Sequence, residues 1–432
     1  MTGRAGLESS DSMAGQGRWL VLLVLTSLIM LNYLDRFVIA ILLQPIKVEM
    51  GLSDGQIGLL TGAAFAILYA GMALPIARLA EQKNRAIILA LSVVVWSVGA
   101  AACGLAGSFL ALLLARAFVG AGEAGAMAPS HSIIADIFPV KQRGTAMALL
   151  TTGGAIGAAC SPLLGGMLLT LFDWRGAFFV LGLAGAPLAL VVVLIVRDPP
   201  RGFSDGLSPE ISSSETQSIG PSLRTLFSKA SFGWITAGLS IMALGHYGLL
   251  LWTPSLLMRS FGWTATATGF AITLYQGLPA LAGSLFGGLL ADMLYRRDRR
   301  WLTRIPMLSA LIAGPFVVFF ATVKSPEMAL FALIIPSLAT GLYLAPCYAA
   351  FQNLAPAHLR TTAAAIAVVC VTIVGAGLGP LLIGGISDVL STHFGAQGLR
   401  YSMLSLAPVF LGAAAMFTRA SRDLVFDLDR VV

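Results

Sequence analysis

Long apolar runs separated by short polar segments dominate this 432-residue chain. Runs of about twenty apolar residues recur along almost its whole length, which is the pattern of membrane-spanning α-helices. A transmembrane barrel would show alternating segments of about ten residues instead. We therefore predict an all-α integral membrane protein with twelve transmembrane helices, near residues 18–43, 54–80, 84–105, 108–138, 141–172, 174–197, 230–259, 264–293, 300–323, 326–353, 357–387 and 397–419.

The polar segment between the sixth and seventh spans divides these helices into two sets of six. It is rich in Ser, Pro and Gly, which is typical of a linker. The first apolar run is too long for a signal peptide, so we interpret it as an uncleaved first helix. We expect a tail, a six-helix bundle, a cytoplasmic linker, a second six-helix bundle and a second tail, over residues 1–17, 18–197, 198–229, 230–419 and 420–432.

The two predicted bundles repeat each other in sequence. "FPVKQRGTAMA", from residue 138, opens the fifth span, and "APAHLRTTAAA", from residue 355, opens the eleventh. "SPLLGG" at 161 likewise matches "GPLLIGG" at 379. A repeat of six helices is the mark of a transporter built from two similar bundles around a site near the membrane midplane.

Charge is scarce and unevenly placed. Only 11% of the residues are charged, against about 25% in soluble domains. Of the 27 lysines and arginines, twenty fall in segments that are cytoplasmic if the N-terminus is inside, and five fall in outer loops. Because cytoplasmic loops carry the positive residues, we predict that both termini are cytoplasmic, in a cell inner membrane. The net charge of +7 then belongs to loops, and we expect no nucleic-acid partner.

Four ionisable side chains lie deep within the predicted spans. Asp35 and Arg36 are in the first span, and Arg116 and Glu123 are in the fourth. Asp35 and Arg116 lie at similar depths, so the two helices can present Asp35 or Arg36 to Arg116. Each buried charge costs at least about 2.5–3.5 kcal/mol, which favours a proton- or anion-binding relay over a static pair that pins two helices.

Glycine marks two further stretches. Gly120, Gly122 and Gly125 in "RAFVGAGEAG" allow another backbone to approach closely. In "GGAIGAACSPLLGG", Pro162 lies in mid-helix and indicates either a hinge or a fixed kink.

The sequence gives no support for an enzyme or a cofactor. It lacks the phosphate-binding loop of ATP-driven pumps. No histidines are paired at metal-ligand spacing, and we expect no metal site. The four cysteines lie inside predicted helices without metal-ligand spacing, so we expect them to pack as small apolar residues.

"RAFVGAG" and "GAIGAACSPLLGG" resemble the fourth- and fifth-helix motifs of the major facilitator superfamily, which implies its two-bundle fold. The superfamily's loop motif between helices two and three is similar to "GLLADMLYRR" in the second half, which keeps Gly288 and Asp292. In the first half, "ARLAEQKNR" has Glu81 at the aspartate position and Arg85 at its end. The resemblance implies that these loops control the conformational change.

"NYLDRFVIA", "RAFVGAGEAGAMAPSHSIIADIFP" and "VRDPPRG" together resemble the Spinster branch in its bacterial form. Members of this branch carry lysophospholipids and sphingolipids, some with protons. The resemblance implies proton and gating roles for Asp35 and Glu123, with Arg36 and Arg116 as charge partners or head-group contacts.

The second half supplies aromatic and amide side chains rather than deep charges. Among these we expect Tyr275, Gln276 and Tyr343 to contact a substrate, because each lies in mid-helix near glycine. His131 would line the path next to Glu123, or pack between helices. A cavity charged on one side and aromatic on the other suits an anionic head with an alkyl tail.

Four functions stay open at this point. The chain is a proton-linked carrier of an amphipathic lipid, a carrier of a small organic anion or an efflux pump for drugs or metabolites, or a membrane receptor without transport. We expect a monomer whose partners are its substrate, protons and membrane lipids.

Overall fold

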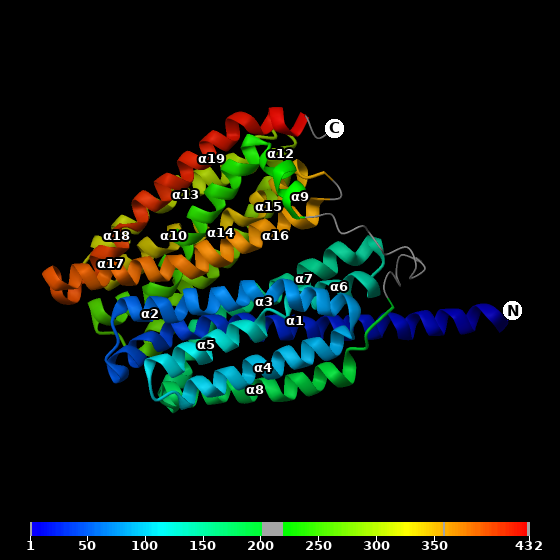
Figure 1. Cartoon of the computed structure of the whole chain (residues 1–432), viewed down its shortest axis with the longest axis horizontal. Coiled ribbons are helices and arrows are strands. Elements are labelled where there is room, and N and C mark those ends of the chain that lie inside the picture. Colours follow the sequence, from blue (N-terminus) through cyan, green and yellow to red (C-terminus); the bar gives the residue numbers. More distant parts are fainter. Residues whose placement is uncertain (1, 201–218, 357–358, 430–432) are drawn as a thin grey trace. The chain divides into compact units, whose positions relative to one another are not determined.

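The computed structural model describes residues 2–200, 219–356 and 359–429, and every regular element in these ranges is a helix (Figure 1). The all-α fold class predicted from the apolar pattern is therefore confirmed. In chain order, the α-helices are α1 (Thr2–Met50), α2 (Asp54–Thr61), α3 (Ala63–Gln82), α4 (Arg85–Leu105), α5 (Phe109–Glu123), α6 (Met127–Ile137), α7 (Val140–Leu171), α8 (Trp174–Ile195), α9 (Ile219–Phe227), α10 (Ala230–Phe261), α11 (Ala265–Ile272), α12 (Leu278–Tyr295), α13 (Trp301–Thr322), α14 (Pro326–Leu342), α15 (Leu344–Leu354), α16 (Arg360–Cys370), α17 (Gly379–Phe394), α18 (Gly398–Leu404) and α19 (Leu406–Asp429). Two π-helical turns and a 3₁₀ turn complete it: η3 (Thr273–Gly277), η5 (Val371–Leu378) and η6 (Gly395–Gln397).

Eleven helical stretches of the described chain are long and apolar enough to cross a membrane. The last of them, Thr362–Asp429, contains both of the final predicted spans. Gly395 has a left-handed φ of 55°, which glycine adopts without strain, and it separates α17 from α18. A Cβ on Gly398 would lie 2.7 Å from the Ser391 nitrogen, so the chain folds back on itself there. The twelfth pass is thus the second arm of this long stretch.

Local sequence explains where several helices begin. The side chains of the residues before α2, α4, α5, α11 and α14 accept a hydrogen bond from a backbone N–H in the first turn: Ser53, Asn84, Ser108, Thr264 and Ser325. Such N-caps satisfy donors that the helix itself leaves without a partner. At α2 the cap is reciprocal, because the Gln56 side chain also accepts from the Ser53 nitrogen at 2.9 Å.

Contacts group the described residues into two compact units. Unit one comprises the described residues of Met1–Arg36, Leu68–Ala158 and Arg175–Glu215, and unit two those of Phe37–Ile67, Ala159–Trp174 and Thr216–Val432. Helices α1, α3 and α7 contribute to both units. This grouping follows contacts, so the boundary between the two halves at residues 198–229 stays a prediction, and residues 201–218 of that linker lie outside the described chain.

Close helix packing in unit one depends on glycine. A Cβ on Gly122 of α5 would lie 2.5 Å from the Trp96 nitrogen of α4, and a Cβ on Gly125 would contact Ser92. The predicted close approach of another backbone is confirmed at Gly122, whereas Gly125 lies against the Ser92 side chain. On α7, Gly157 lies against the Met30 carbonyl of α1, so a side chain at Gly157 would separate the two helices.

Unit two contains a similar contact between the two halves of the sequence. A Cβ on Gly58 of α2 would lie 2.8 Å from the Leu381 Cα of α17, and Gly62 lies against the Gly377 carbonyl. On α7, a Cβ on Gly166 would lie 2.7 Å from the Ala265 carbonyl oxygen of α11. In unit two, therefore, segments of the first sequence half pack directly against the second half.

Candidate functional site

A buried ion pair joins α1 to α5 inside unit one. The Arg36 Nε donates to the Glu123 carboxylate at 2.8 Å, and the two side chains are 13% and 0% exposed. The sequence reasoning expected α1 to present Asp35 or Arg36 to Arg116. The structure records an ion pair of Arg36 with Glu123, two turns further along α5 on nearly the same face, and Arg116 acts electrostatically on Asp35.

Two aromatic rings and an amide surround the Arg36 guanidinium. Its carbon lies 4.9 Å from the centre of the Tyr33 ring and 4.6 Å from that of Tyr69. Its Nη2 also donates to the Asn32 side-chain oxygen at 3.3 Å. A planar guanidinium can stack on rings and donate to a carboxylate at once, which a lysine ammonium cannot do.

Asp35 precedes Arg36 in α1, but its side chain lacks the hydrogen bonds that Arg36 makes. Its carboxyl group is 2% exposed, and neither oxygen has a hydrogen-bond partner among the described residues. Glu123, Arg116 and Arg36 all act on it electrostatically. Asp35, Arg36, Arg116 and Glu123 therefore form one coupled group, which we call the charge cluster.

The helix that carries Arg116 and Glu123 is interrupted beside the cluster. Glu123 is the last residue of α5, residues 124–126 form tight turns, and α6 begins at Met127. Pro129 explains the break, because it has no N–H and its ring would clash with the carbonyl four residues earlier. The fourth predicted span is thus a broken helix, which in transporters is found where backbone lines a cavity.

His131 and its serine neighbours lie on α6, within unit one. His131 is half-buried, and the Ser130 hydroxyl donates to the Ala126 carbonyl at 2.7 Å. Ser132 accepts from the Arg85 guanidinium at 2.7 Å. The α6 helix therefore connects the charge cluster to the loop motif at Arg85.

Arg85 organises a second group of charges in unit one. It forms an ion pair with Asp136 on α6 and another with Asp198, whose oxygen lies 2.6 Å from the Arg85 Nε. Its Nη2 donates to the Pro199 carbonyl at 2.6 Å, and its backbone N–H donates to Asp198. This Arg85 network ties the loop before α4 to α6 and to the segment after α8.

The other loop-motif residues have less packed surroundings. Glu81 and Asp292 are exposed. A Cβ on Gly288 would have only the Ala345 Cβ near it, at 3.9 Å, so this position has room for a side chain. Of the four residues proposed from the loop motifs, Arg85 alone is fully buried in its network.

The predicted substrate contacts of the second half lie in unit two. Tyr343 is buried, and its ring centre is 6.2 Å from that of His246. Tyr275 is half-buried and packs edge-on against Phe331, whose side chain is 62% exposed. Tyr275 thus lies beside an exposed residue, and its contact with a substrate stays a prediction.

Gln276 lies within the π-helical turn η3 and is almost fully buried. Its side-chain oxygen has no hydrogen-bond partner among the described residues, nor has the Thr273 hydroxyl in the same turn. Buried polar atoms are normally paired, and π-turns are frequent at functional sites. Gln276 is therefore the strongest candidate contact in unit two.

Sequence reasoning missed a charged group at the predicted outer ends of the helices. Asp54 accepts two hydrogen bonds from the Arg259 guanidinium, at 2.8 and 2.7 Å, and one each from Lys47 at 2.5 Å and Ser387 at 2.6 Å. Asp388 accepts from the Asp54 and Gly55 backbone N–H groups at 2.7 Å each. This Asp54 network, all within unit two, joins the first half of the sequence to α10 and α17.

A signal for the Asp54 network was present in the sequence. "SDGQ" at 53 is a capping box that starts a helix, and an aspartate in the first turn suits the positive end of the helix dipole. What the sequence did not give was the partner, because Arg259 and Asp388 are more than two hundred residues away in the chain.

The profile of the Major Facilitator Superfamily matches residues 25–380 and 257–425. The chain therefore belongs to the Major Facilitator Superfamily. The fold is similar to the crystal structure of a bacterial homologue of the human lysosomal transporter Spinster in an inward-facing and unoccupied conformation. The TM-score is 0.87 and the sequence identity 30%, over 95% of this chain and 98% of that one.

Two sequence relatives agree with this result. Protein spinster of Drosophila melanogaster is 26% identical over 445 residues, which cover 98% of this chain and 71% of that protein. An MFS-type efflux pump of Mycolicibacterium smegmatis is 31% identical over 417 residues, covering 96% of this chain and 95% of that protein. The Spinster branch suggested by the motifs is supported, and the chain is a multi-pass membrane transporter rather than an enzyme.

Proposed function

We propose that this transporter is a proton-coupled, alternating-access carrier of an amphipathic lipid with an anionic or zwitterionic head. It works in a bacterial inner membrane with both termini in the cytoplasm, as a monomer. The observation that carries the proposal is the carboxyl group of Asp35, which is buried without a hydrogen-bond partner next to the Arg36–Glu123 ion pair.

The cost of burying a charged carboxylate is the reason to assign a proton to Asp35. An isolated carboxylate is expensive to remove from water, whereas a neutral carboxylic acid costs far less. Asp35 is therefore the member of the charge cluster where a proton relieves the largest penalty. When Asp35 loses its proton it needs a cation, and Arg36 and Arg116 both act on it electrostatically.

Exchange of partners would couple the proton to movement. In the recorded arrangement Arg36 is paired with Glu123. If Asp35 ionises, it competes with Glu123 for the Arg36 guanidinium. The electrostatic interaction between α1 and α5 then changes. The broken segment between α5 and α6 begins directly at Glu123, so a shift of this residue passes to α6 and to the Arg85 network.

The two networks of charges would act as gates. By the predicted orientation, the Arg85 network lies at the cytoplasmic side and the Asp54 network at the outer side. Ion pairs of this kind can stabilise one conformation and release in the other. We infer that the Asp54 network must break when the carrier opens to the outside.

The substrate class follows from how polar groups are distributed. The deep charges, Asp35, Arg36, Arg116 and Glu123, all lie on α1 and α5, whereas unit two offers Gln276 and Tyr343 among apolar residues. Arginine suits a phosphate or carboxylate head. Aliphatic and aromatic surroundings suit an alkyl chain. His131 stays a candidate contact next to the charge cluster.

A second function is favoured by one comparison. The Mycolicibacterium smegmatis relative, at 31% identity, is an MFS-type efflux pump. The same charge cluster would couple protons to the export of an amphipathic compound other than a lipid. The distinction is one of substrate and not of mechanism.

The experiment that tests the proposal is uptake into liposomes containing the purified protein. A fluorescent lysophospholipid is offered with and without a pH gradient, and a short carboxylate or an amphipathic drug is added as competitor. We expect gradient-dependent lysophospholipid movement that unlabelled lysophospholipid inhibits and a short carboxylate does not. Drug movement without lysophospholipid movement would favour efflux, and no movement of either would reject the carrier proposal.

A further inference from the structure

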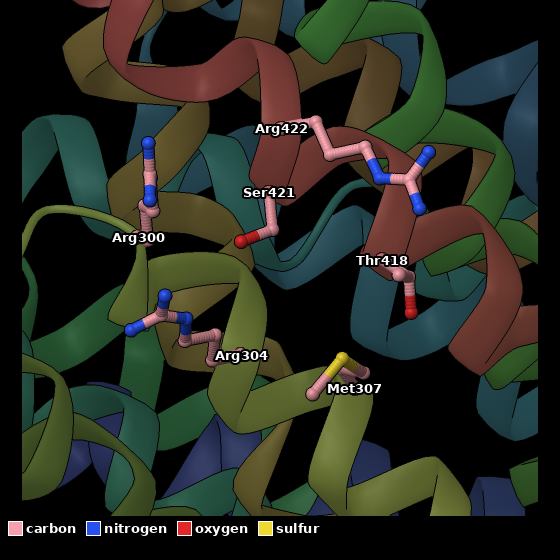
Figure 2. A pocket seen from close by; sticks show the side chains of 6 residues that line it. All are labelled: Arg300, Arg304, Met307, Thr418, Ser421 and Arg422. Carbon is pink, nitrogen blue, oxygen red and sulfur yellow. The ribbon is translucent and has the colours of Figure 1, made fainter.

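A pocket of about 390 Å³ lies in unit two between the start of α13 and the end of α19. Figure 2 shows the six side chains that line it: Arg300, Arg304, Met307, Thr418, Ser421 and Arg422. Three of these are guanidinium groups and two are hydroxyl groups, so the lining is rich in donors for an anion. None of these residues belongs to the charge cluster or to either network.

The positive charge in this pocket is only partly neutralised. Arg304 pairs with Asp298 at 2.8 Å, while both side chains remain about one third exposed. Among the described residues, the structure records no ion pair for the side chain of Arg300 or of Arg422. Asp423 follows Arg422 in the sequence and is half-buried. Two of the three guanidinium groups are thus available to a ligand.

Hydropathy places the pocket at the end of two membrane spans. The span of α13 begins at Trp301, directly after Arg300, and the pocket then continues into its first two turns. Trp301 lies against Arg304, with the guanidinium carbon 5.9 Å from the ring centre. Tryptophan beside arginine is typical of the boundary between membrane and water.

An apolar surface continues from the pocket toward the membrane interior. Leu308 and Leu311 follow Arg304 by one and two turns on nearly the same face of α13, and they are 40% and 41% exposed. Met307 lies between these leucines and the arginines and lines the pocket itself. The site therefore offers cations at the boundary and apolar side chains below them.

We propose that this pocket binds the phosphate group of an anionic membrane phospholipid, with the acyl chains along Leu308 and Leu311. Arginine binds phosphate through paired, charge-assisted hydrogen bonds. Basic pockets between transmembrane helices at the cytoplasmic side bind anionic lipid head groups. The predicted orientation puts these ends of α13 and α19 in the cytoplasm. This site is independent of the transported substrate.

The test compares lipid retention by the full-length protein. Detergent-purified protein is mixed with phosphatidylglycerol, phosphatidylcholine or inorganic phosphate, and bound lipid is counted by native mass spectrometry while thermal unfolding is followed. We expect wild type to retain phosphatidylglycerol in preference to phosphatidylcholine. The double variant R300Q/R422Q should bind it about thirtyfold more weakly, since each cation near the membrane surface contributes about a factor of five.

The matched control is R296Q/R297Q, which removes the same charge from exposed positions of the same loop outside the pocket. It should bind phosphatidylglycerol like wild type. Equal losses in both double variants, or none in either, would overturn the proposal. If inorganic phosphate alone stabilises wild type and not R300Q/R422Q, the phosphate site stands but its ligand is free phosphate. The single variant R422Q, at an exposed side chain, covers the case in which the double variant unfolds.

Discussion

The Arg36 guanidinium donates to the Glu123 carboxylate at 2.8 Å, whereas the adjacent Asp35 has a buried carboxyl group with no hydrogen-bond partner among the described residues. Both acids act electrostatically on each other, and both lie within reach of the same two arginines. Glu123 is therefore paired and Asp35 is not, although either acid could pair with an arginine of the charge cluster. The predictions below follow from this asymmetry.

Removing one partner of the Arg36–Glu123 ion pair should destabilise the fold more than the loss of the pair's own contribution. Removing one partner leaves a buried charge, so R36Q and E123Q should each lower the free energy of unfolding by about 3–5 kcal/mol. The double variant R36Q/E123Q should lose clearly less than the sum of the two. Thermal unfolding in detergent gives the comparison.

The control for this cycle is the exposed pair between Arg299 and Asp429, whose side chains are 49% and 64% exposed. R299Q should change stability by no more than about 1 kcal/mol, because exposed pairs contribute little. Strict additivity of R36Q and E123Q would mean that the two groups do not interact in the folded protein.

Asp35→Asn should abolish the dependence of transport on pH while leaving the protein folded. Asparagine has the same shape but cannot ionise, so the variant should unfold at the same temperature as wild type or higher. Transport at several pH values and thermal unfolding are measured on the same preparation. D429N, at an exposed carboxylate, is the matched substitution, and it should retain the pH response. Unchanged pH dependence in D35N would remove Asp35 from the proton path.

Arg116→Lys should impair transport at least about tenfold without unfolding the chain. Arg116 is almost fully buried and interacts electrostatically with Asp35 and Glu123. Lysine keeps the charge but cannot present a planar group with several donors. Initial rates of uptake measure the effect. Wild-type turnover in R116K would show that any buried cation suffices at this position.

Arg259→Gln should weaken the gate that we propose at the Asp54 network. Arg259 makes two hydrogen bonds to Asp54, and Ser387 beside them is fully buried. In a background without other cysteines, S387C is then labelled with a membrane-impermeant maleimide from outside. We expect faster labelling when R259Q is added, by about tenfold if the lost pair is worth at least 1.4 kcal/mol. R299Q should leave the labelling rate unchanged, and equal rates in all three proteins would argue against a gate.

The helical membrane fold could be predicted from the sequence, because each span is recognisable from the length of its own apolar run. It also identified the deep charges, since an ionisable residue inside a span is rare and needs a reason. Close helix packing at Gly122 and Gly125 was predictable for a similar reason. A glycine has no side chain, and this can be seen from the sequence without knowing which helix lies against it.

Pairing was not predictable, because it depends on rotation and register between helices. Seven residues on a helix separate Arg116 from Glu123, and the sequence alone did not show that Arg36 pairs with Glu123. The break after Glu123 was missed although Pro129 is a breaker signal, because the surrounding apolar run is continuous. The Asp54 network was missed since its members are remote in sequence and lie where charges are expected anyway.

The most direct test of the account is proton movement driven by the substrate alone. Liposomes containing the protein and an internal pH indicator, without an imposed pH gradient, are given lysophospholipid on one side. We expect wild type to change the internal pH as the lipid moves, and D35N to move lipid without a pH change or not at all. Lipid movement by wild type without any pH change, or an equal pH change in D35N, would contradict the central claim.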